Sequence, residues 1–333
     1  MKVIGKGAVH IYDPVDECPH VPGSEEQWQE SFVIFVWDVK RKVYVFLRIG
    51  QEPNRGTGHT AVWLNAWTPE HTFHHTDISV PMSAGDRTAT SLTSGGGLCR
   101  YEFDGAHQWS VNAPDVEIRL TLKDDHPGFG YWPDSSGSLT NETAKNHIEG
   151  TGWTTGTVTL KGKTYQIGGI GWRDHSWGRR NWNGILTHRG IGAMFGKDFN
   201  FMGITFIGAD GKKVKFGSVT RGDTIRAVDN FRVVAYVDED GISNLGGKVL
   251  VEFAGETHVL DFRMLAKGAI SPHQNFSCVD TMCEVVRSGT GGDRVGVGFF
   301  ETTHNAMGGS LRPNIFADST GIIDNGIYPA GFG

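Results

Sequence analysis

The feature that most limits the fold of this chain is a series of short β-branched and aromatic runs, each bounded by a turn. Ser31–Trp37 and Val43–Ile49 flank a short charged turn, a pattern that is typical of a β-hairpin. Asp115–Leu122 alternates apolar and polar residues, as a half-buried strand does. No window of about a dozen residues shows a helical period. The sequence therefore predicts an all-β fold of antiparallel sheets, either sandwiches or barrels.

The same pattern continues on both sides of a central motif, Gly169–Trp182. Further strands are expected at His59–Trp67, Thr157–Leu160, Thr164–Ile167, Phe201–Ile207, Lys213–Val219, Phe231–Val237, Lys248–Phe253, Thr257–Phe262 and Arg294–Thr302, and a short helix at Ser24–Glu30. The chain has 333 residues, enough for two domains of ordinary size or one large β-domain. We expect two, an N-terminal β-domain over residues 1–185 and a C-terminal β-domain over residues 186–333.

Composition and charge narrow the classes of function. Apolar residues make up 38% and charged residues 20% of the chain, as in a soluble, folded protein. The net charge of −6 and the lack of a Lys/Arg-rich run argue against a nucleic-acid partner. No apolar run approaches the ~18 residues of a membrane span, and no signal-peptide core is visible. We therefore expect a cytoplasmic protein without stable membrane insertion.

The sequence also lacks the common cofactor signatures. The four cysteines, Cys18, Cys99, Cys278 and Cys283, follow no zinc-binding spacing, and we expect buried thiols outside any disulfide framework. No dinucleotide-binding, phosphate-loop or nucleophile-elbow motif occurs. The histidine-rich stretch His71–Asp77 could supply metal ligands. The alternative, which we expect, is a polar loop that follows Pro69.

The central motif concentrates chemically active side chains. Its fourteen residues hold one aspartate, one histidine, one serine, three arginines and three tryptophans. As a strand it would place alternate residues on opposite faces, with Trp172, Asp174 and Ser176 on one and Arg173, His175 and Trp177 on the other. Asp174 and His175 could reach one cavity only if the backbone bulged or the strand ended there, and Gly178 would allow either.

Asp174 is the candidate acid of this motif. In an apolar cavity walled by tryptophans its pKa would rise, because burial disfavours a carboxylate, and the neutral acid could protonate a substrate. Indole faces would stabilise a cation by roughly 0.5–2 kcal/mol each. The alternative is that Asp174 pairs with Arg173, Arg179 or Arg180 and that the tryptophans fill a domain interface.

Three further places could contribute to a site. His147 and Glu149 would share a strand face and could orient a water or carry a second proton, or they could form a plain surface pair. Glu301, at the end of a late strand, could point into a second barrel or into solvent. The long segment Lys123–Gly150 includes Tyr131 and Trp132, and we expect a packed lid or pocket wall there.

The motif Asp174-His175-Ser176-Trp177-Gly178-x-Arg180 resembles the AttH-like, tandem-lipocalin superfamily. His147–Gly150, Gly156–Leu160 and Gly171–Arg173 add to the resemblance, and Trp28–Phe32 with Arg48–Asn54 are similar to its uncharacterised bacterial branch. The superfamily includes carotenoid 1,2-hydratases, kievitone-hydratase-like proteins and Diels–Alderase-like cyclases.

The resemblance implies two lipocalin-like β-domains with an apolar pocket at or near their junction. It implies an enzyme without metal or organic cofactor that hydrates, dehydrates, isomerises or cyclises a hydrophobic terpenoid, steroid or polyketide-like alkene. Asp174 would donate the proton, His175 would assist it or accept the proton from the attacking water, and Trp177 would wall the cation. The expected substrate-binding residues are Trp172, Trp182, Arg180, His147, Glu149, Tyr131, Trp132 and Glu301. The alternatives are a lipocalin-like carrier and, more weakly, a metal hydrolase at His71–Asp77. A homodimer is compatible with all of these functions.

Overall fold

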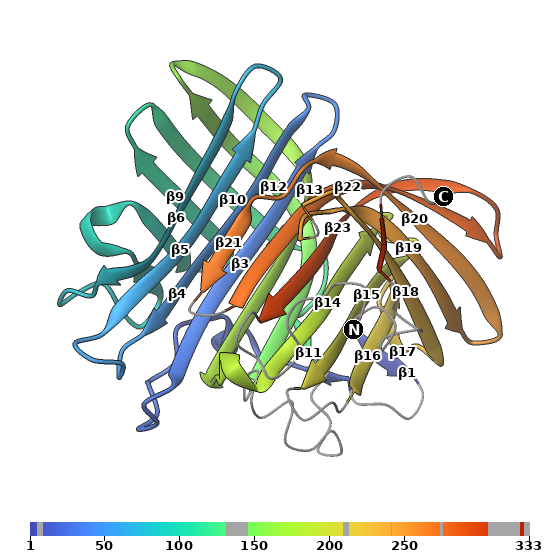
Figure 1. The fold of residues 1–333 in the computed structure, drawn as a ribbon, viewed down its shortest axis with the longest axis horizontal. Coiled ribbons are helices and arrows are strands. Elements are labelled where there is room, and N and C mark those ends of the chain that lie inside the picture. The colour runs from blue at the N-terminus through green and yellow to red at the C-terminus, as the bar shows by residue number, and fades with distance from the viewer. Residues whose placement is uncertain are drawn as a thin grey trace. The chain divides into compact units, whose positions relative to one another are not determined.

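The computed structural model describes residues 1–4, 9–130, 146–208, 213–240, 242–273, 276–305 and 327–329. These residues build two curled, mainly antiparallel β-sheets (Figure 1), so the expected all-β, lipocalin-like fold is confirmed. The described residues from His10 to Asn181 form one compact unit, here the N-terminal unit. Those from Trp182 onward, together with the first residues of the chain, form the C-terminal unit. Among the described residues, no helix is long and apolar enough to cross a membrane.

The sheet of the N-terminal unit has the strand order β6-β5-β4-β3-β13-β12-β10-β9-β8-β7, with β11 and β2 joined at the side of β12. Its strands are β2 (His10–Ile11), β3 (Trp28–Asp38), β4 (Val43–Glu52), β5 (His59–Trp67), β6 (Thr72–Pro81), β7 (Ser91–Thr93), β8 (Cys99–Phe103), β9 (His107–Ala113), β10 (Val116–Asp124), β11 (Phe129–Gly130), β12 (Asn146–Leu160) and β13 (Lys163–Arg179). The hydrogen-bonded neighbours of β13, which carries most of the central motif, are β3 and β12.

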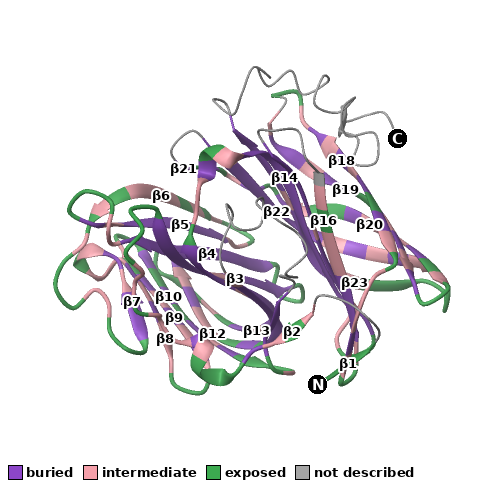
Figure 2. Ribbon diagram, turned by 90° about the horizontal axis from the view of Figure 1, so that it is seen from below, coloured by how far each residue is buried: buried purple, intermediate pink, exposed green. Residues whose placement is uncertain are grey.

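One face of this sheet packs into an apolar core. Phe32, Ile34 and Val36 of β3 belong to it, together with alternate residues of β4, β5, β9 and β10. Each such side chain contributes about 1.5–3 kcal/mol when it is withdrawn from water. The central strands are buried on both faces, since β4 has no exposed residue, and Figure 2 shows β3, β4 and β13 as buried along most of their length.

The sheet of the C-terminal unit has the order β1-β17-β16-β15-β14-β23-β22-β20-β19-β18-β24, with β21 paired to β22. Its strands are β1 (Lys2–Ile4), β14 (Ile185–Met194), β15 (Asn200–Gly208), β16 (Lys213–Arg221), β17 (Thr224–Ala227), β18 (Asn230–Val237), β19 (Asn244–Phe253), β20 (Glu256–Ala266), β21 (Ile270–His273), β22 (Phe276–Gly289), β23 (Arg294–Asn305) and β24 (Ile327–Pro329). Its own core gathers buried side chains such as Phe231, Phe262 and Phe300.

Two local expectations were wrong. His71–Asp77 is not a loop: most of it lies in β6, which pairs along β5 at the end of the sheet order within the described residues. A strand with one open flank tolerates polar residues, and His74 Nδ1 bonds to Asn65 Oδ1 at 2.6 Å. Ser24–Glu30 forms no helix, because the backbone has already entered β3 at Trp28.

Candidate functional site

The central motif lies on an unbroken strand. β13 pairs residue by residue with β12 and with β3 from Ile170 to Trp177, without a bulge. Successive side chains therefore alternate strictly between the two faces of the sheet, as the sequence predicts for this motif. Asp174 and Ser176 lie on the face away from the core, whereas His175 and Trp177 lie on the core-side face with Phe32.

Asp174 belongs to a four-residue polar cluster. Across β12, His147 lies opposite Ser176 and Glu149 lies opposite Asp174. Ser176 Oγ donates to Asp174 Oδ1 at 3.2 Å and is 2.7 Å from His147 Nδ1, which therefore donates to it. His147 Nε2 is 2.5 Å from Glu149 Oε1. The result is a continuous hydrogen-bonded chain from buried Glu149 through His147 and Ser176 to the partly exposed Asp174.

This chain holds a proton near neutral pH. Burial raises the pKa of Glu149 to about 8, against the lowering effect of His147. Burial alone would lower the pKa of His147, but the negative charges of Asp174 and Glu149 outweigh it and the pKa is raised. Whichever partner carries it, the proton between Nε2 and Oε1 stays in the pair at pH 7. A buried acid–base pair that opens toward a half-exposed carboxylate is suited to proton transfer.

Apolar and aromatic side chains surround Asp174 on its own face. Val33 of β3 lies directly opposite it and is also only partly buried. Two residues along, Trp172 lies opposite Phe35, with ring centroids 5.3 Å apart. An apolar molecule that reaches Asp174 would therefore lie against the partly exposed Val33, with the buried rings of Trp172 and Phe35 two residues along.

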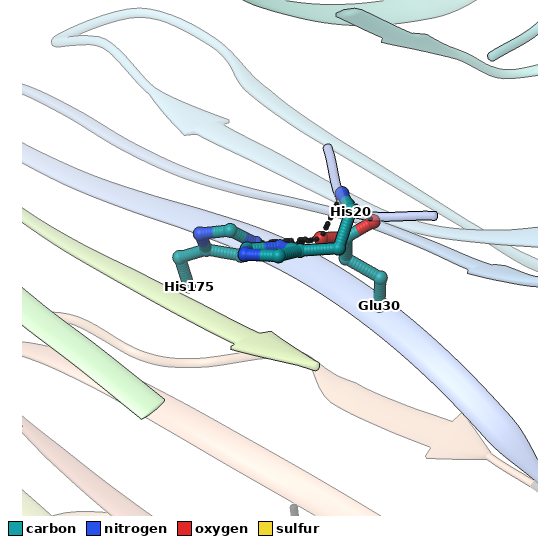
Figure 3. A group of neighbouring side chains, drawn as sticks. All are labelled: His20, Glu30 and His175. Atoms are coloured by element: carbon teal, nitrogen blue, oxygen red, sulfur yellow. Dashed lines mark hydrogen bonds and ion pairs between the residues drawn. The ribbon is translucent and has the colours of Figure 1, made fainter. Parts of the chain in front are cut away.

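A second cluster occupies the core-side face of the same strand. Glu30 Oε1 accepts from His175 Nε2 at 2.9 Å and from His20 Nδ1 at 2.8 Å (Figure 3). Arg87 pairs with the other oxygen of Glu30. Burial would raise the pKa of Glu30, but the bonds from His175 and His20 outweigh it and lower the pKa to about 2. The His20 ring stacks on Trp177, with centroids 3.9 Å apart. This cluster holds an ionised carboxylate and orients the motif from its core side.

Arg173 is also committed to the core-side face. It donates to Asp124 and, through Nη2, to Glu17 Oε1 at 2.7 Å, and His107 Nε2 lies 3.1 Å from Asp124 Oδ2. The expected alternative pairing of Asp174 with Arg173 is not what the structure shows, because the two side chains leave opposite faces of β13. This guanidinium is therefore bonded to Asp124 and Glu17 and not to Asp174.

The structure brings only some of the other expected site residues to Asp174. His147, Glu149 and Trp172 share a face with Asp174, whereas His175 and Trp177 do not, so His175 cannot assist Asp174 by direct contact. His147 occupies that place instead.

Arg180 is near enough to lower the pKa of His147 by its charge. Trp182 and Glu301 belong to the C-terminal unit, where Trp182 packs on Phe276 and Glu301 pairs with His188. Tyr131 and Trp132 lie outside the described residues.

A polar groove of about 420 Å³ lies elsewhere in the N-terminal unit. Arg100, Glu102 and Arg119 line it, together with Thr155 and Gln166 of β12 and β13. None of the expected site residues lines it, and its charged walls do not suit an apolar ligand.

Comparison with known proteins places the chain in a family. The model of a domain of unknown function, DUF7064, matches residues 13–306. The chain belongs to the DUF7064 family. No curated protein matches the chain by sequence.

Solved structures show the fold of this DUF7064 protein. An AttH protein of Nitrosomonas europaea is 12% identical, with a TM-score of 0.63 over 92% of this chain and 99% of that one. Kievitone hydratase from Nectria haematococca is 13% identical, with a TM-score of 0.60 over 91% and 96%. CghA with Sch210972 is 13% identical, with a TM-score of 0.58 over 90% and 98%. The resemblance to the AttH-like superfamily is thus confirmed at the level of fold.

Sequence reasoning did not find the core-side partners of this DUF7064 motif. His20, Glu30 and Arg87 come from three separate segments: the pairing of β3 with β13 places Glu30 beside His175, and His20 and Arg87 reach Glu30 from outside the named strands. One signal was visible: Glu30 stands in the apolar strand Trp28–Asp38, where an ionisable residue needs a buried partner.

Proposed function

We propose that this DUF7064 protein is an acid–base enzyme that adds water to, or removes water from, a carbon–carbon double bond of an apolar small molecule. The observation that carries the proposal is the hydrogen-bonded chain Glu149–His147–Ser176–Asp174 on the face away from the core. These groups supply proton transfer from the protein's own side chains. One of the similar structures supports this class of reaction, since it is a hydratase by name and shares the fold.

In the hydration direction Asp174 is the final proton donor. The proton held by Glu149 and His147 passes through the Ser176 hydroxyl to Asp174, each group giving one proton and taking one. The Asp174 O–H bond breaks as a C–H bond forms at one alkene carbon, and the π electrons leave a cation on the neighbouring carbon. Water adds to that cation, and the proton it loses passes back through Asp174 and Ser176 to the Glu149–His147 pair, which restores the starting state. Dehydration runs through the same steps in reverse.

The aromatic surroundings suit such a cation. Trp172 and Phe35 flank Asp174 on its own face, and an indole face stabilises a nearby cation by roughly 0.5–2 kcal/mol. Trp177, on the other face, acts with His175 and Glu30 as a positioning group. A terpenoid, steroid or polyketide-like alkene is the substrate class that we propose, because the transfer of an apolar molecule from water to such surroundings is favourable.

The test is turnover in heavy-oxygen water. Wild type and Asp174→Asn would be incubated with panels of terpenes, steroids and prenylated aromatics and with the corresponding alcohols, and products would be read by mass spectrometry. We expect a labelled alcohol or an alkene product from wild type, reduced by about 10²–10⁴-fold in Asp174→Asn. Asp125→Asn, an exposed aspartate of the same unit, is the matched control and should keep full activity.

Two outcomes would change the proposal. Unlabelled isomers that disappear in Asp174→Asn would indicate an isomerase or cyclase that uses the same acid. Ligands retained unchanged and equally by both proteins would show a lipocalin-like carrier, in which the cluster around Asp174 is structural.

A further inference from the structure

The C-terminal unit contains a second cluster of reactive side chains that the proposed reaction does not use. Cys278 and Asp280 of β22 lie opposite Thr303 and Glu301 of β23, and His188 of β14 lies opposite Thr303 on the other side. The register places all five side chains on one face of three adjacent strands. The apolar core of the unit takes the alternate residues, such as Cys283 and Phe300, so the cluster is on the opposite face.

The donor atoms of this cluster converge. Cys278 Sγ lies 3.3 Å from Asp280 Oδ2 and 3.2 Å from Glu301 Oε1, and His188 Nε2 lies 2.5 Å from Glu301 Oε1. The ligand atoms of Cys278, Asp280 and Glu301 all fall within 4.8 Å of one another. Ligands about 2.0–2.3 Å from a tetrahedral ion are roughly 3.5 Å apart, so the contacts of Cys278 with the two carboxylates already have nearly this spacing. His188 contacts Glu301 and lies outside the group of three, so its imidazole must turn from Glu301 toward the other two ligands when the ion binds.

The surrounding residues are arranged to keep these atoms in place. Thr303 Oγ1 lies 2.7 Å from His188 Nδ1 and accepts the His188 backbone N–H at 2.9 Å, which directs Nε2 toward the carboxylates. Histidines that bind a metal through one ring nitrogen commonly form a hydrogen bond through the other. At Gly190, opposite Glu301, any Cβ would come within 2.8 Å of the Glu301 carboxylate, so glycine leaves the space that this side chain occupies.

An additional polar atom faces the cluster. Ser271 of β21 lies directly opposite Cys278, is fully buried, and its hydroxyl finds no hydrogen-bond partner in the described part of the chain. Buried hydroxyls are normally satisfied, and a group such as this one commonly marks an ion or water. The two carboxylates Asp280 and Glu301 also lie directly opposite each other, an arrangement that a divalent cation would stabilise.

We propose that Cys278, Asp280, Glu301 and His188 bind one divalent transition-metal ion of the zinc class. A thiolate, an imidazole and two carboxylates are the ligand types that zinc takes in proteins, and sulfur disfavours magnesium or calcium. The partly exposed Glu301, with a side-chain exposure of 21%, provides the route of entry, since the Asp280 carboxylate is buried. The site is separate from the Asp174 cluster in residues and in unit, so either assignment can fail alone.

The test uses the full-length protein, stripped with a chelator and then titrated with Co²⁺ and, in parallel, with Zn²⁺. We expect about one equivalent to bind, with a sulfur-to-cobalt charge-transfer band that Zn²⁺ abolishes by displacement. Cys278→Ser should remove the band, and Glu301→Gln should weaken binding by at least about tenfold. Cys283→Ala, which removes a buried thiol on the opposite face of the same strand, is the matched control. It should keep the charge-transfer band and the affinity for cobalt.

The variants also protect against a folding artefact. Thr303→Val keeps the shape of a side chain that is not a ligand, and it should weaken cobalt binding about 10–100-fold while the band is retained at saturation. Thermal unfolding of each apo variant establishes that it is folded. The proposal is overturned if wild type binds less than about half an equivalent, or if bound cobalt shows no sulfur band, which would place the ion at a carboxylate–histidine cluster elsewhere.

Discussion

Glu149 Oε1 lies 2.5 Å from Nε2 of His147, while Glu149 Oε2 is buried without a hydrogen-bond partner in the described part of the chain. A carboxylate with one bare oxygen would be costly to bury, whereas a neutral carboxyl that donates its proton to His147 leaves only a carbonyl oxygen unpaired. The geometry and the raised pKa of Glu149 therefore agree on a protonated reservoir behind Asp174.

Replacing Glu149 by glutamine should remove the reservoir and spare the fold. Gln has the same shape and is neutral, so the free energy of unfolding at pH 7 should change by less than about 1 kcal/mol. The kcat should fall by about 10²-fold or more, because the amide cannot pass on a proton. Steady-state kinetics and urea unfolding measure the two effects, and Glu117→Gln, on the exposed face of β10, serves as the control. Unchanged kcat in Glu149→Gln would remove Glu149 from the mechanism.

Ser176→Ala should break the chain between His147 and Asp174. We expect kcat to fall by about 10²-fold with little change in KM, since the hydroxyl carries a proton and contributes little apolar surface to binding. Ser31→Ala is the matched control, because Ser31 is buried opposite Ser176 on the neighbouring strand and shares its face. Equal losses in the two variants would indicate a packing effect.

The stability of the protein should depend on pH through Glu149. Its pKa is raised from 4.5 to about 8 in the folded chain, so the folded state binds the proton more tightly than the unfolded one. The stability gained in this way is fully present below pH 4.5 and is lost as the pH rises toward 8. Urea unfolding between pH 5 and 9 should show a decline in wild type that is smaller in Glu149→Gln. Parallel profiles would mean that Glu149 is already ionised in the folded state.

The core-side cluster predicts the opposite dependence. The pKa of Glu30 is lowered from 4.5 to about 2, so the stability that the ionised Glu30 contributes is fully present above pH 4.5. This stability is lost as the pH falls from 4.5 toward 2. Glu30→Gln should lower the free energy of unfolding by about 3–5 kcal/mol at pH 7, because His20, His175 and Arg87 lose their shared anion. Glu26→Gln, exposed and four residues away, should be neutral. A loss below about 1 kcal/mol in Glu30→Gln would show that the cluster stabilises little.

Two adjacent glycines on β13 should respond differently to alanine. A Cβ on Gly169 would come within 2.0 Å of the Trp37 carbonyl oxygen, whereas the nearest atom to a Cβ on Gly168 is 3.7 Å away. Gly169→Ala should therefore lower the free energy of unfolding by about 1–3 kcal/mol, and Gly168→Ala should leave it unchanged or raise it slightly. Denaturant unfolding compares them directly, and equal effects would contradict the close approach of β13 to β3.

Much of the fold was predictable because periodicity is a local property. His59–Trp67 coincides with β5, and the alternation of Asp115–Leu122 recurs as alternate burial in β10. The hairpin of β12 and β13 is far longer than its apolar parts suggest, at 15 and 17 residues. Glycines and threonines extend it without giving an apolar pattern: threonine favours strands, and glycine allows the backbones to approach closely.

The site was predictable only along one strand at a time. The shared face of His147 and Glu149, and that of Asp174 and Ser176, follow from a period of two. The proton chain forms only when these two strands pair in the right register. The contact of His147 with Ser176 joins residues 29 positions apart, and it could not be predicted from either strand alone. For the same reason the partnership of His175 with Glu30 was missed.

The strict alternation of β13 has an evolutionary consequence. Between Trp172 and Trp177 the odd-numbered side chains serve the core-side ion network and the even-numbered ones serve the proton chain. Gain or loss of one codon in this stretch would exchange the two sets, burying Asp174 among the core residues and moving Arg173 or His175 to the other face. A substitution changes one side chain at a time, whereas an insertion or deletion changes the face on which the following side chains lie. Among proteins related to this one, insertions and deletions in this segment should therefore be rarer than substitutions.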